Sequence, residues 1–142
     1  IVAIKEASGN LSQVARLAYL ADGCIDIYSG NDDQVLPICS LGGIGVISVL
    51  ANVAPKETHE MVYDCLNGDY AAAAKIQLKA VPLIGQLFCE VNPIPVKAAL
   101  AMMGRMQEVL RLPLLPLSPS HRPRLQATLA QAGIASVAGL AA

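Results

Sequence analysis

Short apolar runs alternate with longer amphipathic segments through the first half of the chain. Residues 1–4 are continuously apolar, which is typical of a parallel strand that is covered on both faces. Two further short segments that are mostly apolar, at residues 25–28 and 46–49, predict two more strands. Because the strand starts are about 20 residues apart and a helical pattern follows each, we predict successive βα units of a parallel sheet.

The helices predicted between these strands have recognisable ends. Asn10 is a suitable N-cap for a first helix whose apolar residues share one face, and Gly23 is a suitable stop. A second helix is predicted over residues 34–41. A third is predicted over residues 55–67, because proline is favoured in a first turn and Gly68 can end the helix.

The pattern changes at Gly68, after which only helices are predicted. These helices are interrupted by LRLPLLPLSP, residues 110–119, which predicts an extended connector punctuated by prolines. A last helix is predicted over residues 120–131. We therefore predict two domains, an α/β domain over residues 1–68 and an all-helical domain over residues 69–142.

Composition and charge exclude some classes of protein. The chain of 142 residues is 54% hydrophobic and 15% charged, which is typical of a folded globular protein. Its 10 basic and 11 acidic residues give a net charge of -1 without a basic cluster, which argues against a nucleic-acid partner. The longest uncharged stretch, residues 34–54, contains proline and three glycines, so we predict no membrane span and no membrane partner.

The four cysteines are far apart in the sequence. Cys24, Cys39, Cys65 and Cys89 form no Cys-x-x-Cys pair, and no histidine stands at zinc-finger spacing. This spacing predicts neither a metal site nor a disulfide scaffold, and we expect buried thiols. No basic segment followed by an apolar signal region opens the chain, so we expect a cytoplasmic protein.

Lys5 follows the first apolar run directly. The carboxyl end of a parallel strand is where many α/β folds place their functional residues. Desolvation there lowers the pKa of an amine and makes it a nucleophile toward carbonyl carbons. The alternative is a lysine whose stem packs while its ammonium reaches water. Strand alternation turns Glu6 away from Lys5, so we expect Glu6 to pack or to form hydrogen bonds beneath the site.

Other polar residues have structural interpretations. Asp32 and Asp33 stand at the start of a predicted helix, where we expect them to cap the first amides and to complement the helix dipole. Asn31 is assigned no catalytic role. His59 and His121 lie in polar helical sequence without evident partners, and we expect both at the surface.

The glycines at 42, 43 and 45 could suggest a phosphate-binding loop. Glycines that bind dinucleotides or phosphates follow a strand and open a helix, whereas these precede a predicted strand. We therefore expect no nucleotide at this position.

Five separated motifs resemble one family. In chain order they are AIKEASGN, YSGNDD, GGIGVISVLANV, NPIPVKAAL and LRLPLLPL. They resemble the dihydrodipicolinate synthase family, a group of pyruvate-dependent class I aldolases, from Ile1 to about Ile134. The related N-acetylneuraminate lyases and sugar-acid aldolases share the lysine motif, but NPIPVK and LRLPL resemble the synthase branch.

The resemblance implies a (β/α)8 barrel followed by a C-terminal helical domain. A barrel of this kind alone takes about 250 residues. The motif lysine matches the sixth barrel strand of the family. The resemblance therefore implies that residues 1–68 are the last three strands of the barrel, that residues 69–142 are the C-terminal helical domain, and that the first five strands are missing.

The resemblance also implies an activity. Lys5 would form a Schiff base with pyruvate, whose enamine adds to L-aspartate semialdehyde and gives 4-hydroxy-tetrahydrodipicolinate in lysine and diaminopimelate biosynthesis. Gly30 and Ile47 match residues whose backbone faces the pyruvate, and no cofactor or metal is implied. We expect a homo-oligomer, with the chain inactive alone. The alternatives are a related pyruvate aldolase and a non-catalytic oligomerising fragment.

Overall fold

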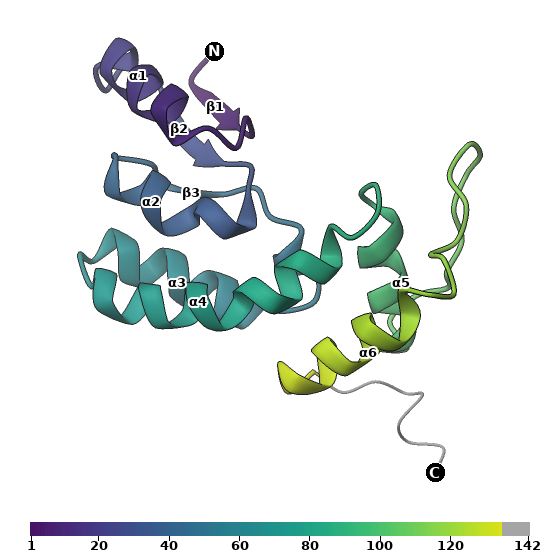
Figure 1. Ribbon diagram of the computed structural model, residues 1–142. Coiled ribbons are helices and arrows are strands. Elements are labelled where there is room, and N and C mark those ends of the chain that lie inside the picture. The colour runs from purple at the N-terminus through teal and green to yellow at the C-terminus, as the bar shows by residue number, and fades with distance from the viewer. Residues whose placement is uncertain (135–142) are drawn as a thin grey trace. The chain divides into compact units, whose positions relative to one another are not determined.

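The computed structural model describes residues 1–134, which form two compact units (Figure 1). The α/β unit contains residues 1–51 and 55–78, and the helical unit contains residues 52–54 and those described from residue 79 onward. The boundary between the two units therefore falls after residue 78, within a helix. It lies ten residues beyond Gly68, where the sequence pattern changes. The reason is that the first half of this helix packs in the α/β unit, where Ala73 and Gln77 are buried.

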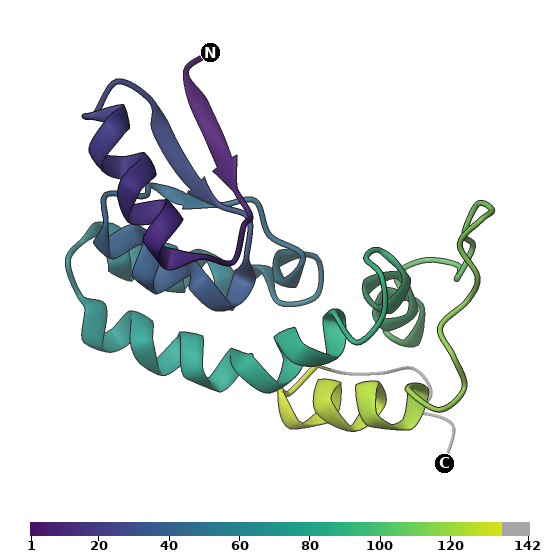
Figure 2. The ribbon, with the colours of Figure 1, turned by 45° about the horizontal axis from the view of Figure 1, so that its top comes forward.

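A three-stranded parallel sheet organises the α/β unit. The strands β1 (Ala3–Glu6), β2 (Asp26–Ser29) and β3 (Gly45–Val46) lie in chain order (Figure 2). The register pairs Lys5 with Tyr28 and Tyr28 with Gly45. The predicted α/β class and parallel pairing are confirmed. β3 is shorter than the run predicted over residues 46–49.

Each strand is followed by a helix. These helices are α1 (Leu11–Ala21), α2 (Val35–Ser40) and α3 (Pro55–Leu66), and α4 (Tyr70–Leu87) follows α3 directly. Two short 3-10 helices precede α2 and α3, namely η1 (Asp32–Gln34) and η2 (Leu50–Asn52). The Asn10 carboxamide oxygen accepts hydrogen bonds from the backbone N–H groups of Ser12 and Gln13, at 3.0 and 3.2 Å, so the predicted N-cap is confirmed.

Two apolar clusters hold the α/β unit together. One joins the sheet to α1 and α2 through Val14, Ile27 and Ile38, with Ile4 packed against them. The other joins α2, α3 and the start of α4, and its buried members are Val35, Cys39, Met61, Cys65 and Ala73. Since Ile4 and Ile27 face the helices, alternation along the strands turns Lys5 and Tyr28 to the opposite face.

The helical unit contains α5 (Ile94–Met102) and α6 (Arg122–Gln131), which contact each other. The segment between them is irregular, as predicted from its prolines. This segment bonds to both helices. The Lys97 ammonium of α5 donates a hydrogen bond to the Val109 carbonyl oxygen, and Arg122 of α6 forms an ion pair with Glu108.

No helix within residues 1–134 is both long enough and apolar enough to cross a membrane.

The cysteines differ in burial. Cys39 and Cys65 are buried in the second cluster, as expected, whereas Cys24 is exposed and Cys89 is half-buried. The expectation of four buried thiols is therefore wrong for two of them. Desolvation, with a smaller contribution from Cys65, raises the pKa of the Cys39 thiol to about 12.

We expect thiol reagents to distinguish these cysteines. The thiolate is the nucleophile, so a buried thiol with a raised pKa reacts slowly and an exposed one reacts readily. In native protein a maleimide should modify Cys24 within minutes and leave Cys39 and Cys65 unmodified, while in urea all four should react. Peptide mass mapping measures this, and modification of Cys39 as fast as Cys24 in native protein would contradict the described packing.

Candidate functional site

The carboxyl ends of the three strands bring together the residues that the sequence singles out. Lys5 lies near the end of β1, Gly30 directly follows β2, and Ile47 directly follows β3. The Gly30 N–H donates to the Glu6 carbonyl oxygen at 2.6 Å, and the Ile47 N–H donates to the Ser29 carbonyl oxygen at 2.8 Å. Three predicted site residues, separated by up to 42 positions in sequence, therefore lie together at the carboxyl ends of the strands of one sheet.

Lys5 itself is exposed in this chain. Its Cε atom lies only 3.0 Å from where a Cβ on Gly30 would stand, so its stem runs beside the Gly30 backbone. A desolvated amine was expected at this position, but Lys5 is not buried in the described residues. The reason is that α1 and α2 cover the opposite face of the sheet.

Gly30 occupies a position where no side chain fits. A Cβ there would lie 2.5 Å from the Ala7 Cβ and 2.9 Å from the Glu6 carbonyl oxygen. Both contacts are closer than van der Waals distance, and both involve atoms fixed by the backbone. Glycine thus allows the loop after β2 to lie directly against the end of β1, beside Lys5.

Glu6 lies on the helix-covered side of β1 and is 6% exposed. One carboxylate oxygen accepts the Ser8 N–H at 2.6 Å, and the other lies 3.4 Å from the Gln13 Nε2. Hydrogen bonds from the Ser8 side chain and backbone lower the pKa of Glu6 against the opposing effect of burial. The expectation of a hydrogen-bonding residue beneath the site is confirmed.

Asp32 is not a helix cap. It is 1% exposed, and its carboxylate accepts hydrogen bonds from the Ser48 hydroxyl at 2.5 Å and from the N–H groups of Val49 and Leu50 at 3.0 and 2.9 Å. The expected capping role is wrong for Asp32 because its partners come from the segment after β3, more than 15 residues away. Asp33 is exposed in the first turn of η1, where a negative charge complements the helix dipole.

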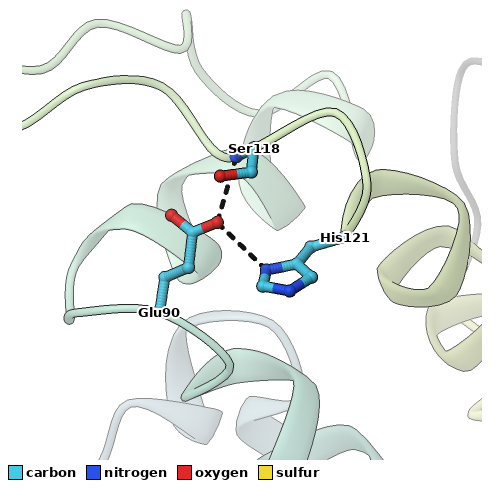
Figure 3. Close-up of polar contacts among 3 residues, drawn as sticks. All are labelled: Glu90, Ser118 and His121. Atoms are coloured by element: carbon cyan, nitrogen blue, oxygen red, sulfur yellow. Dashed lines mark hydrogen bonds and ion pairs between the residues drawn. The ribbon is translucent and has the colours of Figure 1, made fainter.

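Both histidines have partners, contrary to the sequence-based expectation. In the helical unit the His121 Nδ1 lies 3.0 Å from the Glu90 Oε1, which also accepts the Ser118 N–H at 3.1 Å (Figure 3). In the α/β unit the exposed His59 ring stacks on Tyr63, with ring centroids 5.9 Å apart. The i,i+4 spacing of the second pair could have indicated that contact, but nothing in the sequence links Glu90 to a histidine 31 residues later.

We expect Glu90 to make the stability of the helical unit depend on pH. Its hydrogen bonds with Ser118, assisted by His121, lower its pKa from the ordinary value of 4.5. A carboxylate whose pKa is lowered on folding contributes stability above its unfolded pKa and loses it as the pH falls through the folded value. We expect the Glu90→Gln variant to lose less stability than the unmodified protein between pH 5 and pH 3, measured by urea unfolding. Parallel losses in the two proteins would contradict this role.

Within residues 1–134, no three or more histidine, cysteine or acidic side chains are grouped so that they could hold a metal ion.

These features define a parallel α/β protein with a lysine amine at the carboxyl edge of its sheet. Residues 1–132 match the model of the Dihydrodipicolinate synthetase family. The chain belongs to this family.

The similar proteins are named for one activity. The chain is 55% identical over 134 residues to a 4-hydroxy-tetrahydrodipicolinate synthase of Caldicellulosiruptor bescii, a match that covers 94% of this chain and 45% of the relative. A crystal structure of dihydrodipicolinate synthase from Aquifex aeolicus matches with a TM-score of 0.93 at 36% identity, covering 96% of this chain and 46% of that one. The synthase from Acinetobacter baumannii complexed with pyruvate matches with a TM-score of 0.92 at 40% identity, covering 95% and 46%. The chain thus spans about half the length of the relatives that it matches.

Proposed function

We propose that the chain supplies the lysine-bearing part of a lyase that condenses pyruvate with L-aspartate semialdehyde to 4-hydroxy-tetrahydrodipicolinate. The reaction belongs to lysine and diaminopimelate biosynthesis in the cytoplasm. The observation that carries the proposal is the position of Lys5 at the carboxyl edge of the sheet, beside Gly30, in a member of this family. The relative from Acinetobacter baumannii that was crystallised with pyruvate supports the choice of substrate.

The Lys5 amine is the nucleophile in this proposal. Its nitrogen attacks the keto carbon of pyruvate, and loss of water leaves an imine. The protonated imine nitrogen accepts the electron pair left when the methyl group loses a proton, so the enamine carbon can attack the semialdehyde carbonyl. Hydrolysis or displacement of the resulting imine frees the amine again. The step requires no metal ion, because the protonated imine is itself the electron sink.

Gly30 and Ile47 have backbone roles in this proposal. The absence of a side chain at Gly30 lets the loop after β2 lie directly against the end of β1 and the Lys5 stem, so that its backbone would face a keto acid bound to the amine. The Ile47 N–H is engaged by the Ser29 carbonyl oxygen, which fixes the peptide that follows β3 close to the same edge. Their side chains add no chemistry, so substitutions at both positions should act through shape.

We infer further that residues 1–68 are the last three strands of a (β/α)8 barrel and that residues 69–142, of which 135–142 lie outside the described residues, belong to its C-terminal helical domain. The sheet order in chain sequence and the change to helices alone after α3 support this assignment, as does a length close to half that of the relatives. The remaining strands would then cover the face on which Lys5 is exposed and desolvate its amine.

Reductive trapping tests the proposed chemistry. The protein is incubated with pyruvate and sodium borohydride, and the added mass is located by peptide mapping. We expect one adduct, on Lys5, and none in the Lys5→Ala variant. An adduct on Lys56 or Lys97 in place of Lys5, or none in a preparation that contains the rest of the barrel, would overturn the proposal.

We also expect the chain to associate through its sheet edges. β1 and β3 are edge strands of the described sheet, and Ile1, Val2 and Ile47 expose apolar surface beside them. Unpaired edges with apolar neighbours favour strand pairing between chains. Sedimentation at micromolar concentration should therefore show dimers or larger species, and a stable monomer that binds no hydrophobic dye would contradict this expectation.

A further inference from the structure

Asp32 is a buried carboxylate that the proposed chemistry does not use. Burying a carboxyl group at 1% exposure is costly unless its oxygens are hydrogen-bonded. Here the compensation comes from the Ser48 hydroxyl on one oxygen and from the Val49 and Leu50 N–H groups on the other. All three donors lie on one segment, residues 48–50, so the carboxylate acts as a clamp on that segment.

The clamp begins where the sheet ends. The Ile47 N–H donates to the Ser29 carbonyl oxygen directly after β3, and the next residue, Ser48, donates to Asp32. Asp32 therefore continues the attachment of the segment after β3 to the loop after β2 by side-chain hydrogen bonds. The Ser48 hydroxyl also accepts the Ala51 N–H at 2.8 Å, so the hydrogen bonds that begin at Asp32 reach into η2.

The backbone around Asp32 is itself held by hydrogen bonds. The Gln77 side chain of α4, which is 5% exposed, donates from Nε2 to the Asp32 carbonyl oxygen at 2.8 Å. Its Oε1 accepts the Leu36 N–H of α2 at 3.3 Å. On the other side of Asp32, the Ser29 hydroxyl donates to the Asn31 carbonyl oxygen at 2.7 Å. The backbone around Asp32 is thus fixed on both sides, so its carboxylate is aimed at residues 48–50.

We propose that Asp32 is a positioning residue, which sets the distance of the Ile47 peptide and the Gly30 loop from the Lys5 amine. The inference rests on the proposed function, because that function places pyruvate among these three groups. A displacement of about 1 Å at a reacting centre can lower a rate about a hundredfold. A carboxylate that joins two of the three site loops therefore controls the chemistry without touching the substrate.

The first test measures the clamp in the chain by itself. Asp32→Asn keeps the shape of the side chain but replaces one acceptor oxygen by an NH2 donor. This NH2 group then faces either the Ser48 hydroxyl or the Val49 and Leu50 N–H groups, which are donors themselves. The matched control is Asp33→Asn, which makes the same change at the exposed neighbouring position. In Asp32→Asn we expect amide hydrogen exchange at Val49 and Leu50 to accelerate about tenfold or more, with no change in Asp33→Asn. Unchanged exchange in Asp32→Asn would overturn the proposal.

The second test separates positioning from stability. Borohydride trapping is measured against pyruvate concentration for Asp32→Asn and for Ile38→Val, a variant that weakens the core of the same unit. We expect the half-saturating pyruvate concentration to rise about tenfold in Asp32→Asn and to stay unchanged in Ile38→Val. Equal behaviour of the two variants would show a structural role only and overturn the proposal.

Two further outcomes are decisive. If Asp32→Asn fails to fold, Ser48→Ala is measured in its place, because it removes the hydroxyl donor to the carboxylate, which also accepts the Ala51 N–H, and keeps the backbone donors of Val49 and Leu50; an unchanged half-saturating pyruvate concentration there overturns the proposal. If the unmodified protein traps no pyruvate even with the rest of the barrel present, the proposed function fails, and the site role of Asp32 fails with it. Exchange at Val49 and Leu50 then still decides whether the clamp itself exists.

Discussion

Replacing Lys5 with alanine should lower the rate of pyruvate condensation by a factor on the order of 10⁴ or more, in an assembly that turns over pyruvate. Removing a covalent nucleophile eliminates the whole low-barrier route, and losses of this size are typical of such variants. Lys5→Arg should be as inactive, because a guanidinium remains protonated and does not form the imine. Steady-state kinetics with both substrates measures the effect.

Lys56→Ala is the matched control for this experiment. Lys56 is an exposed amine at the start of α3, paired with Glu60 at 3.8 Å across one helical turn. Such surface pairs contribute at most about 1 kcal/mol, so both the rate and the stability should stay near those of the unmodified protein. Activity of Lys5→Ala within tenfold of the control would remove Lys5 from the chemistry.

Replacing Gly30 with alanine should destabilise the α/β unit by about 1–3 kcal/mol, since the added methyl group overpacks a closed contact. Its Cβ would lie 2.5 Å from the Ala7 Cβ and 2.9 Å from the Glu6 carbonyl oxygen, so the β2 loop or the end of β1 has to shift. The same shift moves the Lys5 stem. We therefore expect reduced borohydride trapping under conditions where the variant is still folded, with stability measured by urea unfolding.

Gly85→Ala is the control for an added methyl group. Gly85 lies within α4, and a Cβ there would meet no atom within 4 Å. Alanine is favoured over glycine in a helix interior, so this variant should be as stable as the unmodified protein or more stable by about 0.5–1 kcal/mol. Equal stability of Gly30→Ala and Gly85→Ala would contradict the close approach described at Gly30.

Local features of the fold could be predicted from the sequence because their causes lie within a few residues. Asn10 caps α1 through amides two and three positions away, and Gly23 and Gly68 follow helix ends with positive φ angles of 74° and 80°. β3 was predicted too long for a non-local reason. The residues around Ser48 are apolar enough to predict a strand, but the Ser48 hydroxyl and the Val49 N–H donate to the distant Asp32 carboxylate.

In the candidate site, too, features with local causes could be predicted and features with distant partners could not. Lys5 could be singled out because it follows an apolar run, and strand alternation was enough to assign Glu6 to the side away from it. The role of Asp32 could not be predicted, since a carboxylate before a helix has an ordinary local explanation and its true partners are distant in the chain. The pairing of Glu90 with His121 escaped prediction for the same reason.

The agreement between sheet order and chain order also bears on how the α/β unit folds. Each strand pairs with the strand next to it in the chain, about twenty residues away, so each pairing closes a short loop at a modest entropic cost. Folds with such local contacts form faster than those that must wait for distant segments to meet. The sheet can therefore grow one βα unit at a time, and the residues around Lys5 can take their places once β2 has paired with β1.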